Sequence, residues 1–313
     1  MKHLFIVNPT AGGKDSTEPV SARVAQYFSG REGDFEIYTT KAPMDAAKKI
    51  RFEAALCHEL RVYACGGDGT LNECVCGAAG APNVAVTHFP TGTGNDFIKC
   101  FGHEDSERFR DLDALINGEV RPLDIIDCNG RKSINICSVG IDARIGTDVH
   151  KYSAIPVIGG ATGYVTSLFV NLAKGLTQPL RVICNGKLFY GDLLLVCICN
   201  GNHYGGGFNP VPEARPDDGV LDFLVVSKVS RVTFLKVVAN YAKGKYADYP
   251  QYITHLRGNS MEIDSEKEIV VNIDGEAIHT KHVSLKLIPG GVNFIFPSNM
   301  AYFKTEAKEN AEN

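Results

Sequence analysis

The sequence predicts a two-domain protein of the α/β class, with an N-terminal Rossmann-like parallel sheet followed by a β-rich, β-sandwich-like domain. Its 313 residues are too many for one small domain and suit two. Short apolar strands alternate with helix-like segments up to about residue 121, which is the rhythm of a parallel sheet flanked by helices. After Pro122 the pattern changes to strand-length apolar runs, which are typical of a β-rich domain. We therefore expect domains at 1–121 and 122–296, with 297–313 returning to the first domain.

The first domain is expected to contain three short apolar strands, at Leu4–Val7, Arg61–Cys65 and Val84–Phe89. Thr70 follows the second of these strands and is a candidate N-cap for the helix after it. The segments with helical character are Pro19–Ser29, Met44–Glu59, Leu71–Ala79 and Ser106–Asn117.

The second domain is expected to be built mainly from strands. Two helices interrupt it, at Thr162–Leu176 and Val232–Lys243, because their apolar residues are three and four positions apart. The polar end Thr305–Asn313 is predicted to be a disordered tail. The apolar runs of strand length are Leu123–Cys128, Ser133–Ser138, Leu180–Cys184, Leu188–Ile198, Val220–Val226, Ser260–Ile263, Ile269–Ile273 and Val283–Ile288.

Composition limits the partners that the protein can have. A formal net charge of −4 argues against a broad nucleic-acid-binding surface. Ten cysteines without a secretory leader predict reduced thiols in a cytoplasm. Leu193–Cys199, the longest apolar run in the middle of the chain, is too short for a membrane-spanning helix. We therefore expect a cytoplasmic protein that has no transmembrane segment and binds no nucleic acid.

Three Gly- or Pro-rich loops each follow one of the expected N-terminal strands. Loops at the carboxyl ends of parallel strands meet at one edge of the sheet, where such sheets bind ligands. Glycine lets backbone N–H groups approach a phosphate, and a helix that begins after the loop adds its positive dipole end. The loops therefore predict one nucleotide phosphate site. They are Asn8-Pro9-Thr10-Ala11-Gly12, Gly66-Gly67-Asp68-Gly69-Thr70-Leu71-Asn72-Glu73 and Pro90-Thr91-Gly92-Thr93-Gly94-Asn95-Asp96-Phe97.

Asp68 sharpens the interpretation of the middle loop. Gly-rich loops alone indicate only a phosphate or dinucleotide site. A carboxylate inside such a loop would repel phosphate unless it holds a magnesium ion or its water shell, or orients a neighbouring group. A Walker-type loop is excluded, because Asp15 follows Lys14 where Ser or Thr would be needed.

These motifs, with three more in the second domain, resemble the diacylglycerol kinase catalytic family, which also contains sphingosine, ceramide and related bacterial lipid kinases. NAD kinases and phosphofructokinases have similar middle loops, but the combination with the third loop and the last motif is specific. The match covers nearly the whole chain in the family's order, although Ala11 replaces a frequent Ser. The further motifs are Gly201-Asn202 to Gly205-Gly206-Gly207, Pro212-Glu213-Ala214 with Asp217-Asp218-Gly219, and Asn272-Ile273-Asp274-Gly275-Glu276.

The resemblance implies phosphoryl transfer from ATP to a primary hydroxyl of a lipid, with the nucleotide held between two domains. Asp274 resembles the general base that takes the hydroxyl proton, and Glu276 resembles a carboxylate that handles magnesium. Phosphoryl transfer does need a carboxylate near the nucleophile. Taken alone, Asp274-Gly275 is more typical of a plain hairpin turn, but beside the other motifs the base is favoured. The implied nucleotide-binding residues are Asn8, Pro9, Thr10, Gly66, Gly67, Asp68, Gly69, Thr70, Asn72, Glu73, Thr91, Gly92, Thr93, Asn95 and Asp96.

The resemblance also implies a structural Mg²⁺ site in residues 215–220. Asp218 would supply a carboxylate, and the backbone carbonyls of Arg215 and Val220 would complete the ligands, with water connecting the ion to Asp68. Oxygen ligands of this kind suit magnesium. The alternative interpretation is a solvated acidic turn, which Asp-Gly also favours.

A lipid substrate requires peripheral contact with a membrane surface, and residues 143–187 are the candidate region. Leu168 and Leu172 belong to an apolar helical stripe beside basic residues, a pattern that can lie in a membrane interface. Such a stripe is also typical of a buried core, which is the alternative.

Together these features predict a magnesium-dependent ATP:lipid kinase of phospholipid biosynthesis. Diacylglycerol is the expected acceptor, because soluble bacterial-type members of the family commonly use it. Sphingoid bases, ceramide and phosphatidylglycerol are alternative acceptors. NAD kinase is the alternative enzyme, and a lipid- or nucleotide-binding regulator is the alternative without turnover. A homodimer is the candidate assembly, and peripheral association with the membrane is the expected location.

Overall fold

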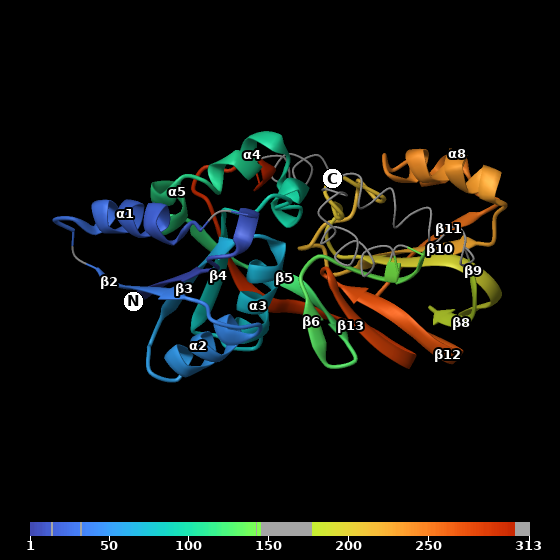
Figure 1. Ribbon diagram of the computed structural model, residues 1–313, viewed down its shortest axis with the longest axis horizontal. Helices are drawn as coiled ribbons and strands as arrows, with labels where there is room; N and C mark the ends of the chain where they lie inside the picture. Colours follow the sequence, from blue (N-terminus) through green and yellow to red (C-terminus); the bar gives the residue numbers. More distant parts are fainter. Residues whose placement is uncertain (14, 32, 142, 145–176, 304–313) are drawn as a thin grey trace, which may run out of the picture. The chain divides into compact units, whose positions relative to one another are not determined.

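The computed structural model describes residues 1–313 except 14, 32, 142, 145–176 and 304–313 (Figure 1). The chain divides into an N-terminal unit, Met1–Asp124 with Pro289–Asn313, and a β-rich unit, Ile125–Ile288. The predicted helix Thr162–Leu176 and the predicted tail Thr305–Asn313 lie outside the described residues. So does most of the candidate membrane region 143–187.

The N-terminal unit is built on a parallel sheet in the order β2-β1-β3-β4. Leu4–Val7 is fully buried, as expected for a central strand of a parallel sheet that is covered on both faces. The C-terminal part of β13 (Glu276–Phe296) adds a short parallel pairing beside β4. The strands are β1 (Lys2–Val7), β2 (Asp34–Thr39), β3 (Leu60–Gly66) and β4 (Val84–Pro90), and the longer helices are α1 (Thr17–Phe28), α2 (Asp45–Ala54) and α3 (Asp68–Ala78).

The prediction of one helix over Ser106–Asn117 is wrong. The chain forms two short helices there, α4 (His103–Arg108) and α5 (Leu112–Ile116), after a 3₁₀ turn at Phe97–Phe101. Asp111 has an extended backbone between them, and its carboxylate accepts hydrogen bonds from the amides of residues 113 and 114 at 3.0 and 3.3 Å. An aspartate that caps a new helix ends the preceding one, because its side chain competes for the backbone.

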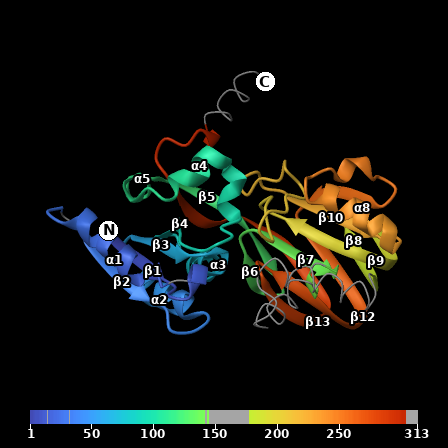
Figure 2. The same cartoon turned by 45° about the horizontal axis from the view of Figure 1, so that its top comes forward.

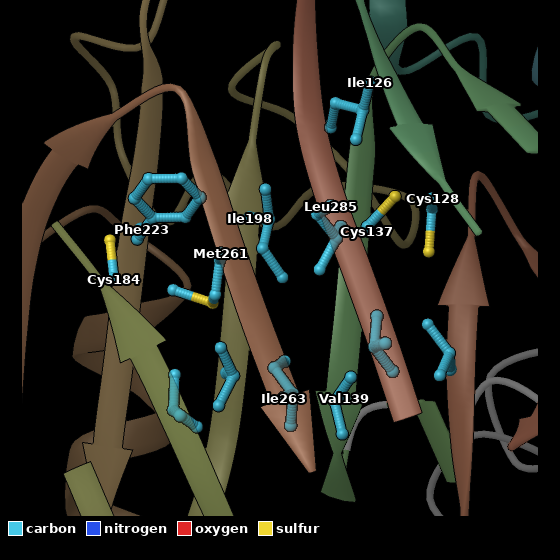
Figure 3. Packing of buried hydrophobic residues seen from close by; sticks show 14 of the residues in the cluster. Ile126, Cys128, Cys137, Val139, Cys184, Ile198, Phe223, Met261, Ile263 and Leu285 are labelled. Carbon is cyan, nitrogen blue, oxygen red and sulfur yellow. The ribbon is translucent and has the colours of Figure 1, made fainter. Parts of the chain in front are cut away.

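The β-rich unit is an antiparallel arrangement in the order β11-β10-β9-β7-β12-β13. β8 pairs with both β9 and β12, and β7 also pairs with both, so these four strands enclose a core. Figure 3 shows side chains from several strands meeting there. The strands are β5 (Glu119–Cys128), β6 (Arg131–Ser133), β7 (Ile136–Gly140), β8 (Gln178–Cys184), β9 (Lys187–Cys199), β10 (Leu221–Ser227), β11 (Ile253–Gly258) and β12 (Ser260–Ile273).

Residue alternation explains why these segments form strands. Along β13, Val283, Leu285 and Leu287 are buried while the residues between them are exposed, which is the period-two pattern of a half-buried strand. The predicted fold class, a parallel α/β sheet with a β-rich second part, is confirmed. Two details differ. Ser260–Ile263 and Ile269–Ile273 form the single strand β12 with an irregularity between its halves, and β11 was not predicted.

A second apolar cluster lies on the other side of β9 and β10 and is covered by α8 (Arg231–Tyr241) (Figure 2). Phe234, Val237 and Tyr241 provide the buried face of this helix. The helix predicted at Val232–Lys243 is therefore confirmed. Ser230 caps it, because the Ser230 hydroxyl accepts a hydrogen bond from the Thr233 amide at 3.1 Å.

Candidate active site

The three Gly- or Pro-rich loops of the N-terminal unit meet at the carboxyl edge of its parallel sheet. Asn8 in the first loop donates a hydrogen bond from Nδ2 to Thr70 Oγ1 in the second, at 3.1 Å. The amides of Thr91 and Gly92 in the third loop both donate to the Gly66 carbonyl, at 2.9 and 3.0 Å. The structure therefore brings together the loops that the sequence predicts to share one site.

Glycines allow this close approach. A Cβ on Gly92 would lie 2.5 Å from Gly67 Cα, and a Cβ on Gly12 would lie 2.5 Å from the Thr91 carbonyl oxygen. Real Cβ atoms do not approach backbone so closely, and Gly12 also has φ of 70°, a conformation that favours glycine. The loops therefore depend on glycine for their contact with one another, besides any contact with a ligand.

The middle loop leads directly into α3, which begins at Asp68 after Gly67. Gly67 has no side chain to cap the first turn, so the helix N-terminus presents backbone N–H groups and a positive dipole end, which suit an anion. The expectation that Thr70 caps this helix is wrong, because Thr70 lies inside the first turn. Its buried hydroxyl instead accepts the hydrogen bond from Asn8.

Asp68 connects the middle loop to the third one. Its Oδ1 accepts a hydrogen bond from the Phe97 amide at 3.0 Å, and its Oδ2 would lie 3.2 Å from a Cβ placed on Gly94. Asp68 is half-buried. The sequence allows Asp68 either to hold magnesium or to orient a neighbouring group. The hydrogen bond from the Phe97 amide shows the second role.

His88, which was not among the predicted site residues, also orders these loops. It is fully buried in β4, and this burial lowers the pKa of the imidazole, so the ring is neutral near pH 7. Its Nε2–H donates to the Gly66 carbonyl at 3.0 Å, the same oxygen that accepts the amides of Thr91 and Gly92. A histidine inside an otherwise apolar strand was the sequence signal for this role.

Asn95 brings a buried acceptor to the third loop. It has a positive φ of 48°, and its Nδ2 donates to the Gly92 carbonyl at 2.8 Å. The side-chain oxygen is buried and accepts no hydrogen bond from the described part of the chain. An unpaired buried acceptor is costly, and a donor group on a bound molecule would satisfy it.

The β-rich unit holds a second set of predicted site residues around Asp274. Asp274 and Gly275 form a two-residue turn between β12 and β13, with φ values of 47° and 92°. The hairpin interpretation is therefore correct, and the Asp274 side chain also accepts hydrogen bonds from another part of the chain. Its carboxylate accepts hydrogen bonds from the amides of residues 134, 135 and 136, at 2.7, 3.2 and 2.8 Å.

Burial raises the pKa of the Asp274 carboxyl to about 6, and the hydrogen bonds from Ile136 and its neighbours oppose that rise. Asp274 is half-buried, so part of the residue remains accessible. A carboxylate with a pKa of about 6 is mostly deprotonated at neutral pH, and it is basic enough to accept a proton there. The arrangement is therefore suited to general-base chemistry.

Hydrogen bonds link Asp274 to the other motifs of the β-rich unit. Asn135, whose amide contacts Asp274, donates from Nδ2 to the His203 carbonyl at 2.8 Å. Asn202 donates from Nδ2 to the Pro212 carbonyl at 3.0 Å. The Gly201, Pro212 and Asp274 motifs are thus neighbours in one network. No sequence pattern indicates Asn135, because its role depends on where the backbone of residues 134–136 lies.

Glu276 is placed differently from Asp274. It is the first residue of β13, its side chain is 56% exposed, and its carboxylate lies 3.9 Å from Arg131 Nη1. The three glycines at 205–207 form a turn with positive φ between Tyr204 and Phe208.

The predicted magnesium loop has a cationic partner of its own. Asp218 accepts a hydrogen bond from the Val220 amide at 3.1 Å and pairs with the Arg257 guanidinium, which also lies 3.3 Å from Asp222. Burial raises the pKa of Asp218. No cluster of three or more metal-binding side chains occurs among the residues that the structure describes. Asp218 therefore faces a cationic side chain in this structure, and Arg215, Asp218 and Val220 stay predicted metal ligands.

No helix in the described ranges is long and apolar enough to cross a membrane.

Two family models match this chain. Residues 2–128 match the diacylglycerol kinase catalytic domain, and residues 135–296 match the YegS C-terminal NAD kinase beta sandwich-like domain. The fold and these matches define a kinase of the lipid-kinase class. The chain belongs to the diacylglycerol kinase catalytic family, as the sequence motifs indicate.

Individual relatives agree with this assignment. The chain is 29% identical over 275 residues to a diacylglycerol kinase from Bacillus subtilis (strain 168), covering 87% of this chain and 88% of the relative. It is 27% identical over 273 residues to a diacylglycerol kinase from Staphylococcus carnosus, covering 87% of each. A crystal structure of a diacylglycerol kinase from Bacillus anthracis superposes with a TM-score of 0.69 and 26% identity, covering 96% of this chain and 98% of that one.

Proposed function

We propose that this kinase transfers the γ-phosphoryl group of ATP to the hydroxyl of diacylglycerol and so forms phosphatidic acid. The observation that carries the proposal is the Asp274 carboxylate, which is fixed by three backbone amides and has a pKa raised to about 6. A hydroxyl nucleophile needs such a positioned base, because its proton must leave as the phosphoryl group arrives. The names of the Bacillus and Staphylococcus relatives favour diacylglycerol as the acceptor.

The three loops of the N-terminal unit would hold ATP. The glycines at their contacts and the uncapped start of α3 present backbone N–H groups, which suit phosphates. The unpaired oxygen of Asn95 would accept a hydrogen bond from a hydroxyl or amino group of the nucleoside. We assign nucleotide binding to the loop residues that the family resemblance implies.

Magnesium would come with ATP, bound to its phosphates, where it would neutralise negative charge. Glu276 is exposed and remains the proposed carboxylate for handling that ion. Asp68 has a role that can be separated from metal handling. Asp68→Asn keeps an oxygen that accepts the Phe97 amide, whereas Asp68→Ala removes it. We expect only Asp68→Ala to weaken ATP binding. Equal losses of ATP affinity in both variants would show that the negative charge of Asp68 is needed, as in the handling of magnesium.

A lipid panel tests the function. Purified protein is incubated with magnesium and ATP and with diacylglycerol, sphingosine, ceramide or phosphatidylglycerol in mixed micelles, with NAD as a separate acceptor. We expect phosphorylation of diacylglycerol. Phosphorylation of NAD alone would replace the proposal by NAD kinase activity, and ATP binding without turnover on any acceptor would indicate a non-catalytic regulator. The same experiment with added chelator tests the magnesium requirement.

A further inference from the structure

The outer side of α8 exposes apolar side chains. Phe234, Val237 and Tyr241 bury the inner side of the helix against the β-rich unit. Val232 and Leu235, by contrast, are 67% and 53% exposed. Residues three or four positions apart lie on one side of a helix. These two residues therefore form an apolar strip that the packing of the unit leaves uncovered.

The chain around this helix is strongly basic. The net charge of the whole protein is −4, yet no acidic residue occurs between Asp222 and Asp248. The basic residues in that interval are Lys228, Arg231, Lys236, Lys243 and Lys245. A local block of positive charge in an acidic protein predicts an anionic partner for that surface.

Most of this positive charge is not neutralised within the protein. Lys228 pairs with Asp192 at 2.8 Å, but both side chains are exposed, and exposed pairs of this kind are weak. Arg231, Lys236 and Lys243 are exposed and form no ion pair within 4.0 Å with any described residue. We define the α8 surface as Val232, Leu235, Arg231, Lys236 and Lys243.

The pattern of the α8 surface matches one class of partner. Val232 and Lys236 are four residues apart, so an apolar and a cationic side chain lie together on the side opposite Phe234. A helix that combines exposed apolar residues with lysines and arginines is suited to the interface of an anionic bilayer, where the apolar groups enter the headgroup region and the cations meet lipid phosphates. A nucleic acid would use the cations but leave the apolar strip exposed.

We propose that the α8 surface docks this protein on an anionic lipid bilayer. The inference rests on the proposed function, since a lipid kinase must meet its acceptor at a membrane, and it adds a docking element to that function. The residues of the α8 surface lie outside the segment 143–187, which is the membrane region predicted from the sequence.

Vesicle binding tests the proposal. Cosedimentation is measured with vesicles of phosphatidylglycerol and phosphatidylcholine, and with vesicles of phosphatidylcholine alone, at low and high salt. We expect the wild-type protein to bind the anionic vesicles and to release them as salt rises. The variant Val232→Ser/Lys236→Gln should bind at least about tenfold more weakly, because it loses one inserted side chain and one charge.

A matched control is available on α2 of the N-terminal unit. Lys48 and Phe52 are also exposed and four residues apart, but that helix carries the acidic residues Asp45 and Glu53. Lys48→Gln/Phe52→Ser should therefore bind vesicles as the wild type does. Unchanged binding by the α8 variant, an equal loss in the α2 control, or no preference of the wild type for anionic vesicles would each overturn the proposal.

A second readout separates docking from catalysis. Kinase activity is measured with a short-chain diacylglycerol in uncharged detergent micelles, where the α8 variant should match the wild type and should keep its melting temperature. Absence of turnover in every variant would reject the proposed function. The vesicle measurement would still decide whether α8 binds the bilayer.

Discussion

Replacing Gly92 by alanine tests whether the contact between the second and third loops forms the nucleotide site. The added Cβ would lie 2.5 Å from Gly67 Cα, 2.9 Å from Gly67 N and 3.1 Å from Asn95 Oδ1. Carbon atoms in favourable contact are about 3.5–4.0 Å apart, so the loops must separate by about 1 Å. Neighbouring backbone cannot rotate away as a long side chain can.

The expected cost is about 1–3 kcal/mol, the usual range for overpacking a close contact. For a domain of this size, about 1 kcal/mol lowers the melting temperature by about 2–4 °C, so the shift should be about 2–12 °C. The separation also removes the amides of Thr91 and Gly92 from the Gly66 carbonyl. ATP affinity should therefore fall together with stability.

Gly67→Ala is the matched control, because it adds a methyl group on the other side of the same contact. Its Cβ would lie 3.6 Å from Gly92 Cα, an ordinary van der Waals distance, and Gly67 has negative φ. Scanning calorimetry measures the melting temperatures, and isothermal titration measures ATP binding. Gly67→Ala should keep wild-type stability. A Gly92→Ala protein with wild-type melting temperature and ATP affinity would refute this description of the loops.

The remaining predictions concern a base, a cap and the predicted ion. Because burial raises the pKa of Asp274 to about 6, kcat/KM should fall as pH drops below that value, and a flat profile from pH 5 to pH 8 would contradict the assignment. The folded state holds this proton more tightly than the unfolded chain does, so the Asp274 contribution to stability should decrease as pH rises from about 4 to about 6, as measured by denaturant unfolding. Asp111→Ala should lower the unfolding free energy by about 1 kcal/mol, because α5 loses its cap; an unchanged urea midpoint would show that the cap contributes nothing. If residues 215–220 hold magnesium as predicted, Mg²⁺ without ATP should raise the melting temperature, and Asp218→Asn should lose that rise; no rise in the wild type would show that Arg257, which pairs with Asp218, excludes the ion.

The sequence was sufficient to predict how the three loops come together. Each loop follows an apolar strand, and parallel strands bring their carboxyl ends to one edge. The contact between Asn8 and Thr70 is a consequence of that rule. The roles of individual side chains were harder to predict, because Asp68 and His88 act by orienting backbone groups whose positions no spacing reveals.

The surroundings of Asp274 show the same limit. The motif predicted a turn or a base, and the structure contains the turn with a carboxylate suited to be a base. The three amides that hold the carboxylate come from residues about 140 positions earlier in the chain, so local sequence could not indicate them. Arg257 was likewise missed as the partner of Asp218, because β11 itself was not predicted.

The most direct test of the account is the transfer of labelled γ-phosphate from ATP to diacylglycerol by the wild type and by Asp274→Asn. ATP binding and melting temperature are measured for both proteins. We predict that the wild type forms labelled phosphatidic acid, and that Asp274→Asn lowers kcat/KM by at least about a hundredfold while ATP affinity is kept, because only the base is lost. Wild-type turnover in Asp274→Asn would remove the base from the mechanism, and no labelled lipid from the wild type would contradict the proposed function.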